Sequence, residues 1–172
     1  IMKRILLITT AFVIFSLPCL KVEAQTLKFG HINTDELIRA MPEYDSAMAK
    51  LTRIQKELIN ELELMQVELN NKYETYNKES KNYTELVRQT KEQELADMSK
   101  RIQDFQLQAQ NQLQEEQTNL TRPIFEKVDK AIKDVGKEGG FIYVFDVAQL
   151  RYFDESRSVN VLPQVKAKLG IK

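Results

Sequence analysis

Apolar residues recur along residues 43–135 at alternating steps of four and three. Between Tyr44 and Tyr76 these steps reach ten positions, of which eight are apolar, although apolar residues make up only 42% of the chain. Heptad spacing of this kind keeps one stripe of a helix against a partner helix. The stretch contains no glycine and only one proline, so the pattern predicts long helix. The ten positions are Tyr44, Met48, Leu51, Gln55, Leu58, Leu62, Met65, Leu69, Lys72 and Tyr76.

A second stripe follows in the same stretch. It runs from Leu95 to Ala109, slips, and resumes from Leu113 to Val135, which resembles a stutter in a coiled coil. Two stripes in one chain predict two long helices folded back on each other, with the reversal inside residues 77–92. At 1.5 Å per residue, an arm of about 45 residues reaches roughly 65–70 Å.

Two features predict that the returning helix is not uniform. Seven glutamines fall between Gln103 and Gln117, which weakens the apolar contact without adding charge and predicts a softer zone. Pro123 removes one helical hydrogen bond and predicts a kink further on.

The segment before the arm predicts one strand and one short helix. Residues 27–32 alternate apolar and polar side chains, as a strand does. Asn33 can cap a helix running from Asp35 to about Met41, with Glu36 placed to complete a capping box. Pro42 suits the first turn of the long arm, where its missing N–H costs nothing.

The segment after the arm predicts a hairpin and a final helix. Glycines at 136, 139 and 140 mark the end of the arm. Residues 141–145 are wholly aromatic or β-branched, which predicts a strand buried on both faces, and a turn near 146–149 leads to a second hairpin strand at 150–153. A helix is predicted over 159–169, with Gly170 ending it.

The first 24 residues have the pattern of a cleaved export signal. Lys3 and Arg4 precede an apolar run over residues 5–17, and small residues before Gln25 suit a cleavage site. A membrane anchor is the competing interpretation, but 13 residues fall short of the roughly 20 needed to span a bilayer. We therefore expect a mature chain that begins at Gln25 and works in an exported compartment.

Composition disfavours most chemistries. Removal of the signal removes Cys19, the only cysteine, so neither disulfides nor thiol chemistry is expected. The whole chain has 25 basic and 25 acidic residues and no dominant basic patch, which disfavours nucleic acid as a partner. His31 is the only histidine, and no glycine-rich phosphate loop or zinc motif is present. We expect no enzyme activity, no cofactor and no metal.

About 55 residues remain outside the signal and the arm. A core of that size is marginal alone and needs disulfides, a metal or oligomerisation. With the first two absent, we expect an obligate oligomer whose subunits share strand edges and aromatic residues. The expected interface residues are Phe29, Phe141, Ile142, Tyr143, Val144, Phe145 and Phe153.

The arm carries more apolar residues than a two-helix seam can bury. A wider seam or packing near the head is the structural explanation of these extra residues. The functional interpretation is that some of them line a surface for apolar stretches of another polypeptide. Methionine suits such a surface because it packs adaptably, and tyrosines near the tip can contact a partner or cap the seam. The candidate contact residues are Met48, Ile59, Met65, Tyr73, Tyr76, Met98 and Phe105.

The chain resembles the Skp/OmpH family of periplasmic chaperones. The resemblance covers almost the whole mature chain, and the pieces that carry it are Phe29–Asn33, Met41–Tyr44, Glu92–Gln112, Arg122–Ile124 and Gly139–Asp146. It implies an α+β, mostly α fold: a long antiparallel helical hairpin (a coiled-coil tentacle, residues 43–135) on a small β-barrel-like oligomerisation body (25–42 and 136–172). It also implies a periplasmic homotrimer that holds unfolded outer-membrane proteins between its tentacles without ATP, before membrane insertion.

One departure from the family changes the expected electrostatics. The best-known members are strongly basic, whereas residues 43–135 here hold 14 basic and 18 acidic residues. Contact with lipopolysaccharide or a membrane surface is therefore only a weak expectation. The alternative function is a structural coiled-coil spacer or adaptor of the cell envelope that binds a folded partner.

Overall fold

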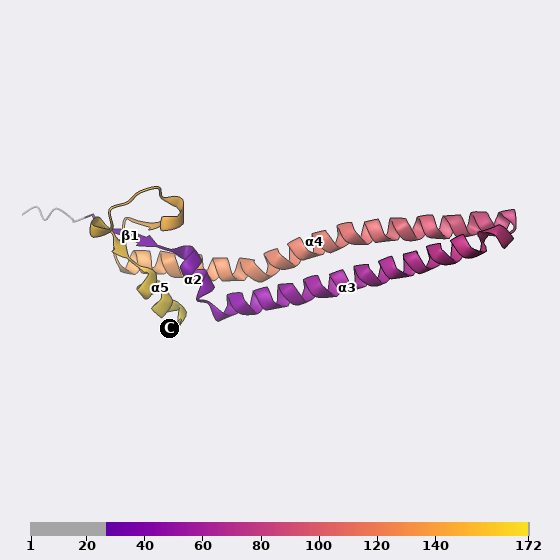
Figure 1. The fold of residues 1–172 in the computed structure, drawn as a ribbon. Coiled ribbons are helices and arrows are strands. Elements are labelled where there is room, and N and C mark those ends of the chain that lie inside the picture. The colour runs from indigo at the N-terminus through magenta and orange to yellow at the C-terminus, as the bar shows by residue number, and fades with distance from the viewer. Residues whose placement is uncertain (1–26, 172) are drawn as a thin grey trace, which may run out of the picture.

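The computed structural model describes residues 27–171, which form a small head and a long arm (Figure 1). We use arm for residues 42–120 and head for residues 27–41 and 121–171. The predicted export signal lies outside the described residues. Among the described residues, no helix is long and apolar enough to cross a membrane.

The arm is an antiparallel helical hairpin, as the heptad stripes predicted. Helix α3 spans Pro42–Glu79, a 3₁₀ turn covers Ser80–Asn82, and helix α4 spans Glu85–Glu138. The reversal falls inside the predicted window. Pro42 stands in the first turn of α3, and Thr84 caps α4 by accepting a hydrogen bond from the Val87 backbone N–H at 3.4 Å.

Helix α4 runs past the point where the sequence predicted its end. It continues through Gly136 and stops at Glu138, and Gly140 then adopts the left-handed conformation with φ of 65°. Pro123 lies inside the helix, and Figure 1 shows α4 changing direction between head and arm. The missing proline N–H and the crowding of its ring against the preceding turn account for such a bend.

A short helix, α2 (Thr34–Arg39), connects the sheet to α3. The Asn33 side chain accepts from the Glu36 backbone N–H at 3.0 Å, so the predicted cap is confirmed. The Glu36 carboxylate does not return the bond of a full capping box but pairs with Lys166 Nζ at 3.1 Å. Glu36 therefore links α2 to the C-terminal helix.

The sheet is open and parallel, and the predicted hairpin is wrong. Strands β1 (Phe29–Ile32), β2 (Tyr143–Asp146) and β3 (Val159–Asn160) lie in the order β2-β1-β3, both outer strands running parallel to β1. Residues 150–153 belong to no strand, and Val159 and Asn160 pair with β1 instead of starting a helix. Parallel neighbours need a long crossover, and here the entire arm is the crossover between β1 and β2.

The last helix, α5 (Leu162–Leu169), begins three residues later than predicted. The Asn160 side chain accepts from the Leu162 backbone N–H at 2.9 Å, so a strand residue starts the helix. Pro163 lies in the first turn. Gly170 ends the helix in the left-handed conformation, as predicted.

The hydrophobic core lies in the head and the base of the arm. Its members come from β1, α2, the start of α3, the end of α4 and α5, and every side chain with less than 2% exposure belongs to it: Ile32, Leu37, Met41, Val128, Val161 and Val165. The core covers only one face of the sheet. Strand β2 alternates exposed and half-buried residues, so within one chain it is not buried on both faces as predicted.

Candidate functional surfaces of the arm and head

The seam of the arm agrees with the predicted stripe. Its apolar positions in α3 are half-buried, whereas Gln55 and Lys72 are exposed. On α4, the resumed heptad pattern predicts Gln117 in the seam, but Glu116 is half-buried there and Gln117 is exposed. Glu116 pairs with Lys50 of α3 at 3.9 Å. Most of the arm is therefore a two-helix contact of half-buried residues, with little fully buried volume.

The predicted partner-binding residues of the arm divide into two groups. Met98 is buried, and four others are half-buried in the seam: Met48, Met65, Tyr76 and Phe105. Ile59 and Tyr73 are exposed. Only the exposed pair is available to another polypeptide while the hairpin is closed, and a role for any of the seven stays a prediction.

Further exposed apolar residues accompany this pair on the arm. They are Leu64, Val67, Leu86, Val87 and Leu107, all of which lie off the predicted stripe. Isolated exposed apolar residues are ordinary on protein surfaces. Their number on a two-helix arm shows that the hairpin cannot bury its own apolar content.

Polar contacts join the two helices at the base and near the tip. At the base, Lys127 forms an ion pair with Glu43 and lowers the pKa of that carboxyl group. Near the tip, the Tyr76 hydroxyl donates a short hydrogen bond to Glu92 of α4, and this bond raises the pKa of Tyr76. These contacts fix which residues of the two helices stand opposite each other.

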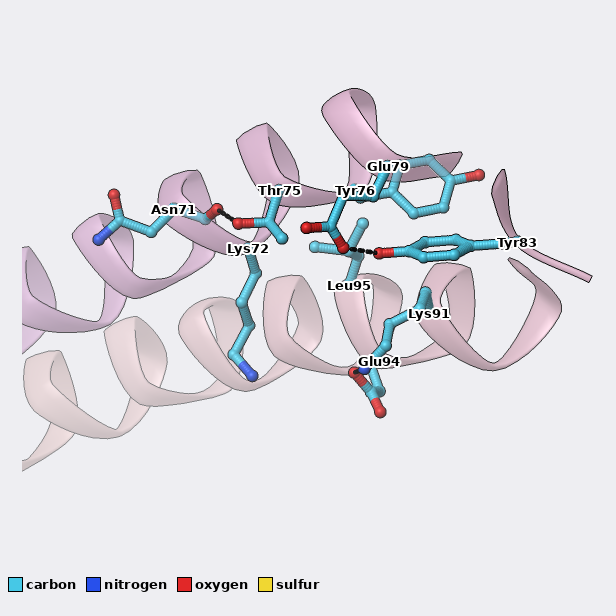
Figure 2. Close-up of a pocket in the computed structure, with 9 residues that line it drawn as sticks. All are labelled: Asn71, Lys72, Thr75, Tyr76, Glu79, Tyr83, Lys91, Glu94 and Leu95. Atoms are coloured by element: carbon cyan, nitrogen blue, oxygen red, sulfur yellow. Dashed lines mark hydrogen bonds and ion pairs between the residues drawn. The ribbon is translucent and has the colours of Figure 1, made fainter. Parts of the chain in front are cut away.

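Two tyrosines line a pocket at the tip of the arm (Figure 2). The rings of Tyr76 and Tyr83 are tilted, with centroids 6.3 Å apart, and the Tyr83 hydroxyl donates to Glu79 at 2.8 Å. The pocket has a volume of about 340 Å³ and is also lined by Leu95 and by charged side chains of both helices. Tyr76 and Tyr83 therefore bond to groups of their own arm at the end of the seam.

An aromatic face covers the side of the sheet that the core leaves open. Phe29 stacks on Tyr143 with centroids 6.2 Å apart, and Tyr143 stacks on Phe145 at 5.6 Å. Tyr143 is 57% and Phe145 42% exposed. Phe153 joins this face through His31, with ring centroids 4.7 Å apart. We call Phe29, His31, Tyr143, Phe145 and Phe153 the aromatic face.

The other predicted interface residues lie elsewhere in the head. Phe141 and Val144 pack against the buried core of their own chain, and Lys28 lies over the Phe141 ring at 4.3 Å. Ile142 is exposed beside the sheet. The sequence thus predicted four members of the aromatic face and mixed them with core residues, because an unbroken apolar strand does not show which residues face inward.

Sequence reasoning also missed one strongly exposed ring in the head. Tyr152 is the most exposed large apolar residue of the described chain. It lies in the segment that was predicted as a strand, where alternation assigned it no special place. No periodic pattern could have indicated the exposure of Tyr152, because the segment is irregular.

His31 makes contacts that hold the head together. Its Nδ1 atom is 2.9 Å from the Ser158 hydroxyl, which links β1 to the segment before β3. Within residues 27–171, no group of three or more histidine, cysteine or acidic residues could hold a metal ion.

The fold defines a class of protein: a small α+β head whose first two strands are connected by a projecting antiparallel helical hairpin. Residues 28–169 match the family described as outer membrane protein (OmpH-like), so the chain belongs to the OmpH-like family. The resemblance found in the sequence is thereby confirmed.

Among solved structures, the chain is similar to a protein from Caulobacter crescentus CB15 that is proposed to be an outer membrane chaperone (OmpH-like). The two share 11% sequence identity and a TM-score of 0.72, and the match covers 83% of each chain. At this identity the likeness establishes the fold alone. A comparison with curated proteins found no match.

Proposed function

We propose that this protein is an ATP-independent periplasmic holdase chaperone. It binds unfolded outer-membrane proteins in a cavity between the tentacles of a homotrimer and prevents their aggregation before membrane insertion. The observation that carries the proposal is the exposed apolar surface of the projecting arm, which its own seam leaves uncovered. Membership of the OmpH-like family and the fold shared with a proposed outer membrane chaperone support it.

In this proposal the head is the oligomerisation body. The aromatic face is apolar and partly exposed, and both β2 and β3 have an unpaired edge. Exposed strand edges and apolar patches are features that soluble proteins cover. Subunits that pack these surfaces together would bury them and complete the β-rich body that the resemblance implies. Each tentacle would then project from a shared base.

The arm suits a client that has not yet folded. An unfolded barrel protein exposes alternating apolar side chains and unpaired strand edges, which aggregate when free. Weak contacts with scattered apolar residues on several arms would hold such a chain through many sites at once, since linked sites raise the effective concentration. This mechanism needs no nucleotide, because contacts that are individually weak release the client spontaneously.

Aggregation suppression tests the proposal directly. A urea-unfolded outer-membrane barrel protein is diluted into buffer without nucleotide, and light scattering is followed with and without the mature chain. We expect scattering to be suppressed at a small molar excess of trimer. Unchanged scattering at several-fold excess would contradict the holdase function. A pull-down that recovers a stable complex with a folded partner would instead favour the envelope spacer.

A further inference from the structure

The middle of the arm contains no basic side chain. Residues 57–71 of α3 and 102–120 of α4 hold seven acidic and no basic residues, although the arm has basic residues toward its base and its tip. We call these two segments the central belt; they lie part-way along the paired helices in Figure 1. The contacts Lys50–Glu116 and Tyr76–Glu92 set the register of the two helices. This register places residues 57–65 of α3 roughly level with 102–110 of α4, so the two segments overlap over part of their length.

The central belt also exposes large apolar side chains. On α3, Ile59 is 46%, Leu64 65% and Val67 55% exposed, and on α4 Leu107 is 61% exposed. The apolar residues of the belt that do belong to the seam, such as Leu62 and Met65, are half-buried. The exposed apolar residues therefore do not contribute to the contact between the two helices.

Three carboxylates of the central belt have no ion-pair partner. Basic residues just outside the belt neutralise several of its acids: Arg53 pairs with Glu57 at 3.8 Å, Lys72 with Glu68 at 3.7 Å, and Lys100 with Asp104 at 2.9 Å. Glu61 and Glu63 of α3 and Glu115 of α4 are exposed, and no ion pair reaches any of them within residues 27–171. Of these, Glu61 and Glu63 lie beside the exposed apolar residues of α3. The negative charge of the belt is thus uncompensated beside its apolar residues.

Helical spacing interleaves these charges with the exposed apolar residues. Ile59, Glu63 and Val67 are four residues apart and share one face of α3, and Glu61 and Leu64 are neighbours three residues apart. A polypeptide lying along this part of α3 meets an apolar side chain and a carboxylate in turn.

We propose that the central belt binds segments of unfolded polypeptide in which lysine or arginine side chains alternate with apolar ones. This inference rests on the proposed holdase function and names the client chemistry that the arm favours. The exposed apolar residues provide area to bury, and Glu61 and Glu63 attract the client's cations while repelling anionic segments. This preference for cationic client segments is the opposite of the preference for acidic clients that is expected of family members with basic arms.

Two peptides of matched apolar content test this inference. Both alternate apolar and charged residues over about 16 positions, one with lysine and one with glutamate, and each carries a fluorophore for anisotropy titration against the full mature chain. We expect the lysine peptide to bind at least about tenfold more tightly at low salt, with the difference shrinking as ionic strength rises.

Paired variants locate the effect. Glu61→Gln with Glu63→Gln is expected to weaken the lysine peptide about fivefold and leave its apolar contacts intact, which is the range for two exposed charge contacts. The matched control is Glu126→Gln with Asp129→Asn, which removes the same charge from exposed positions of α4 in the head. Equal weakening by both pairs would reduce the effect to net charge and overturn the assignment to the belt.

The remaining outcomes separate this inference from the proposed function. If both peptides bind equally, or neither binds, while aggregation of the barrel protein is still suppressed, the cationic preference is wrong and the holdase function stands. If the lysine peptide binds as expected while aggregation is not suppressed, the belt is confirmed as a binding surface and the holdase function fails.

Discussion

The head and the arm are built from the same chain but are held together in different ways. In the head, side chains from the N-terminal segment, the end of α4 and the C-terminal segment with α5 meet in a buried core. In the arm, half-buried residues of one helix meet their counterparts on the next, and few are buried completely. The comparison shows that stability is concentrated in the head, while the arm keeps apolar surface exposed because a two-helix contact cannot bury it.

The largest expected difference is in stability. Leu37 is completely buried in the head, and Leu37→Ala should lower the free energy of unfolding by about 2–5 kcal/mol through lost burial and a residual cavity. Leu62 is half-buried in the arm seam, and Leu62→Ala should cost about 1 kcal/mol because much of its surface already meets water. Urea unfolding followed by circular dichroism measures both. An equal decrease in the free energy of unfolding for both variants would show that the arm seam is packed as tightly as the core of the head.

The second prediction concerns assembly. Tyr143→Glu with Phe145→Glu places two charges on the aromatic face, and sedimentation should then report monomers in place of the proposed trimer. These positions are more informative than Val144, because Val144 packs against its own core and a charge there would also unfold the subunit.

An arm variant provides the control for assembly. Leu64→Glu introduces a charge at an exposed position of the arm and should leave the proposed trimer intact. A trimer that survives the two changes on the aromatic face would place the interface elsewhere in the head.

The smallest expected effect is the pH dependence of the contact at the base of the arm. Lys127 lowers the pKa of Glu43 below its usual value of about 4.5. The stabilisation is therefore complete above the unfolded-state pKa and is lost as the pH falls through the lower folded-state pKa. Thermal unfolding between pH 7 and pH 3 should show a small acid-dependent loss that Glu43→Gln removes. Glu126→Gln, which alters an exposed acid with no ion pair among the described residues, should leave the loss unchanged.

Candidate binding residues were harder to predict than helices. The heptad pattern identified residues such as Met65 and Phe105 as apolar, but it could not distinguish a residue facing the partner helix from one free to bind a client. Exposure makes that distinction, and it points to Ile59 and Val67 instead of the seam methionines. In the head, the same ambiguity mixed Phe145, which is exposed, with Val144, which packs against the core.

Local sequence determined the parts of this protein whose interactions are local. The absence of glycine and the heptad spacing specify two helices, Asn33 specifies the start of α2, and Gly170 specifies the end of α5, because each feature acts within one or two helical turns. Only the tertiary structure decided which strands pair. The two-residue strand β3 has no periodicity of its own, and its partner β1 lies about 130 residues away, joined by the Val161 N–H bonded to the His31 carbonyl at 2.9 Å. The residues of a strand determine its tendency to adopt an extended conformation, but the packing of both strands on one core determines which strand pairs with it.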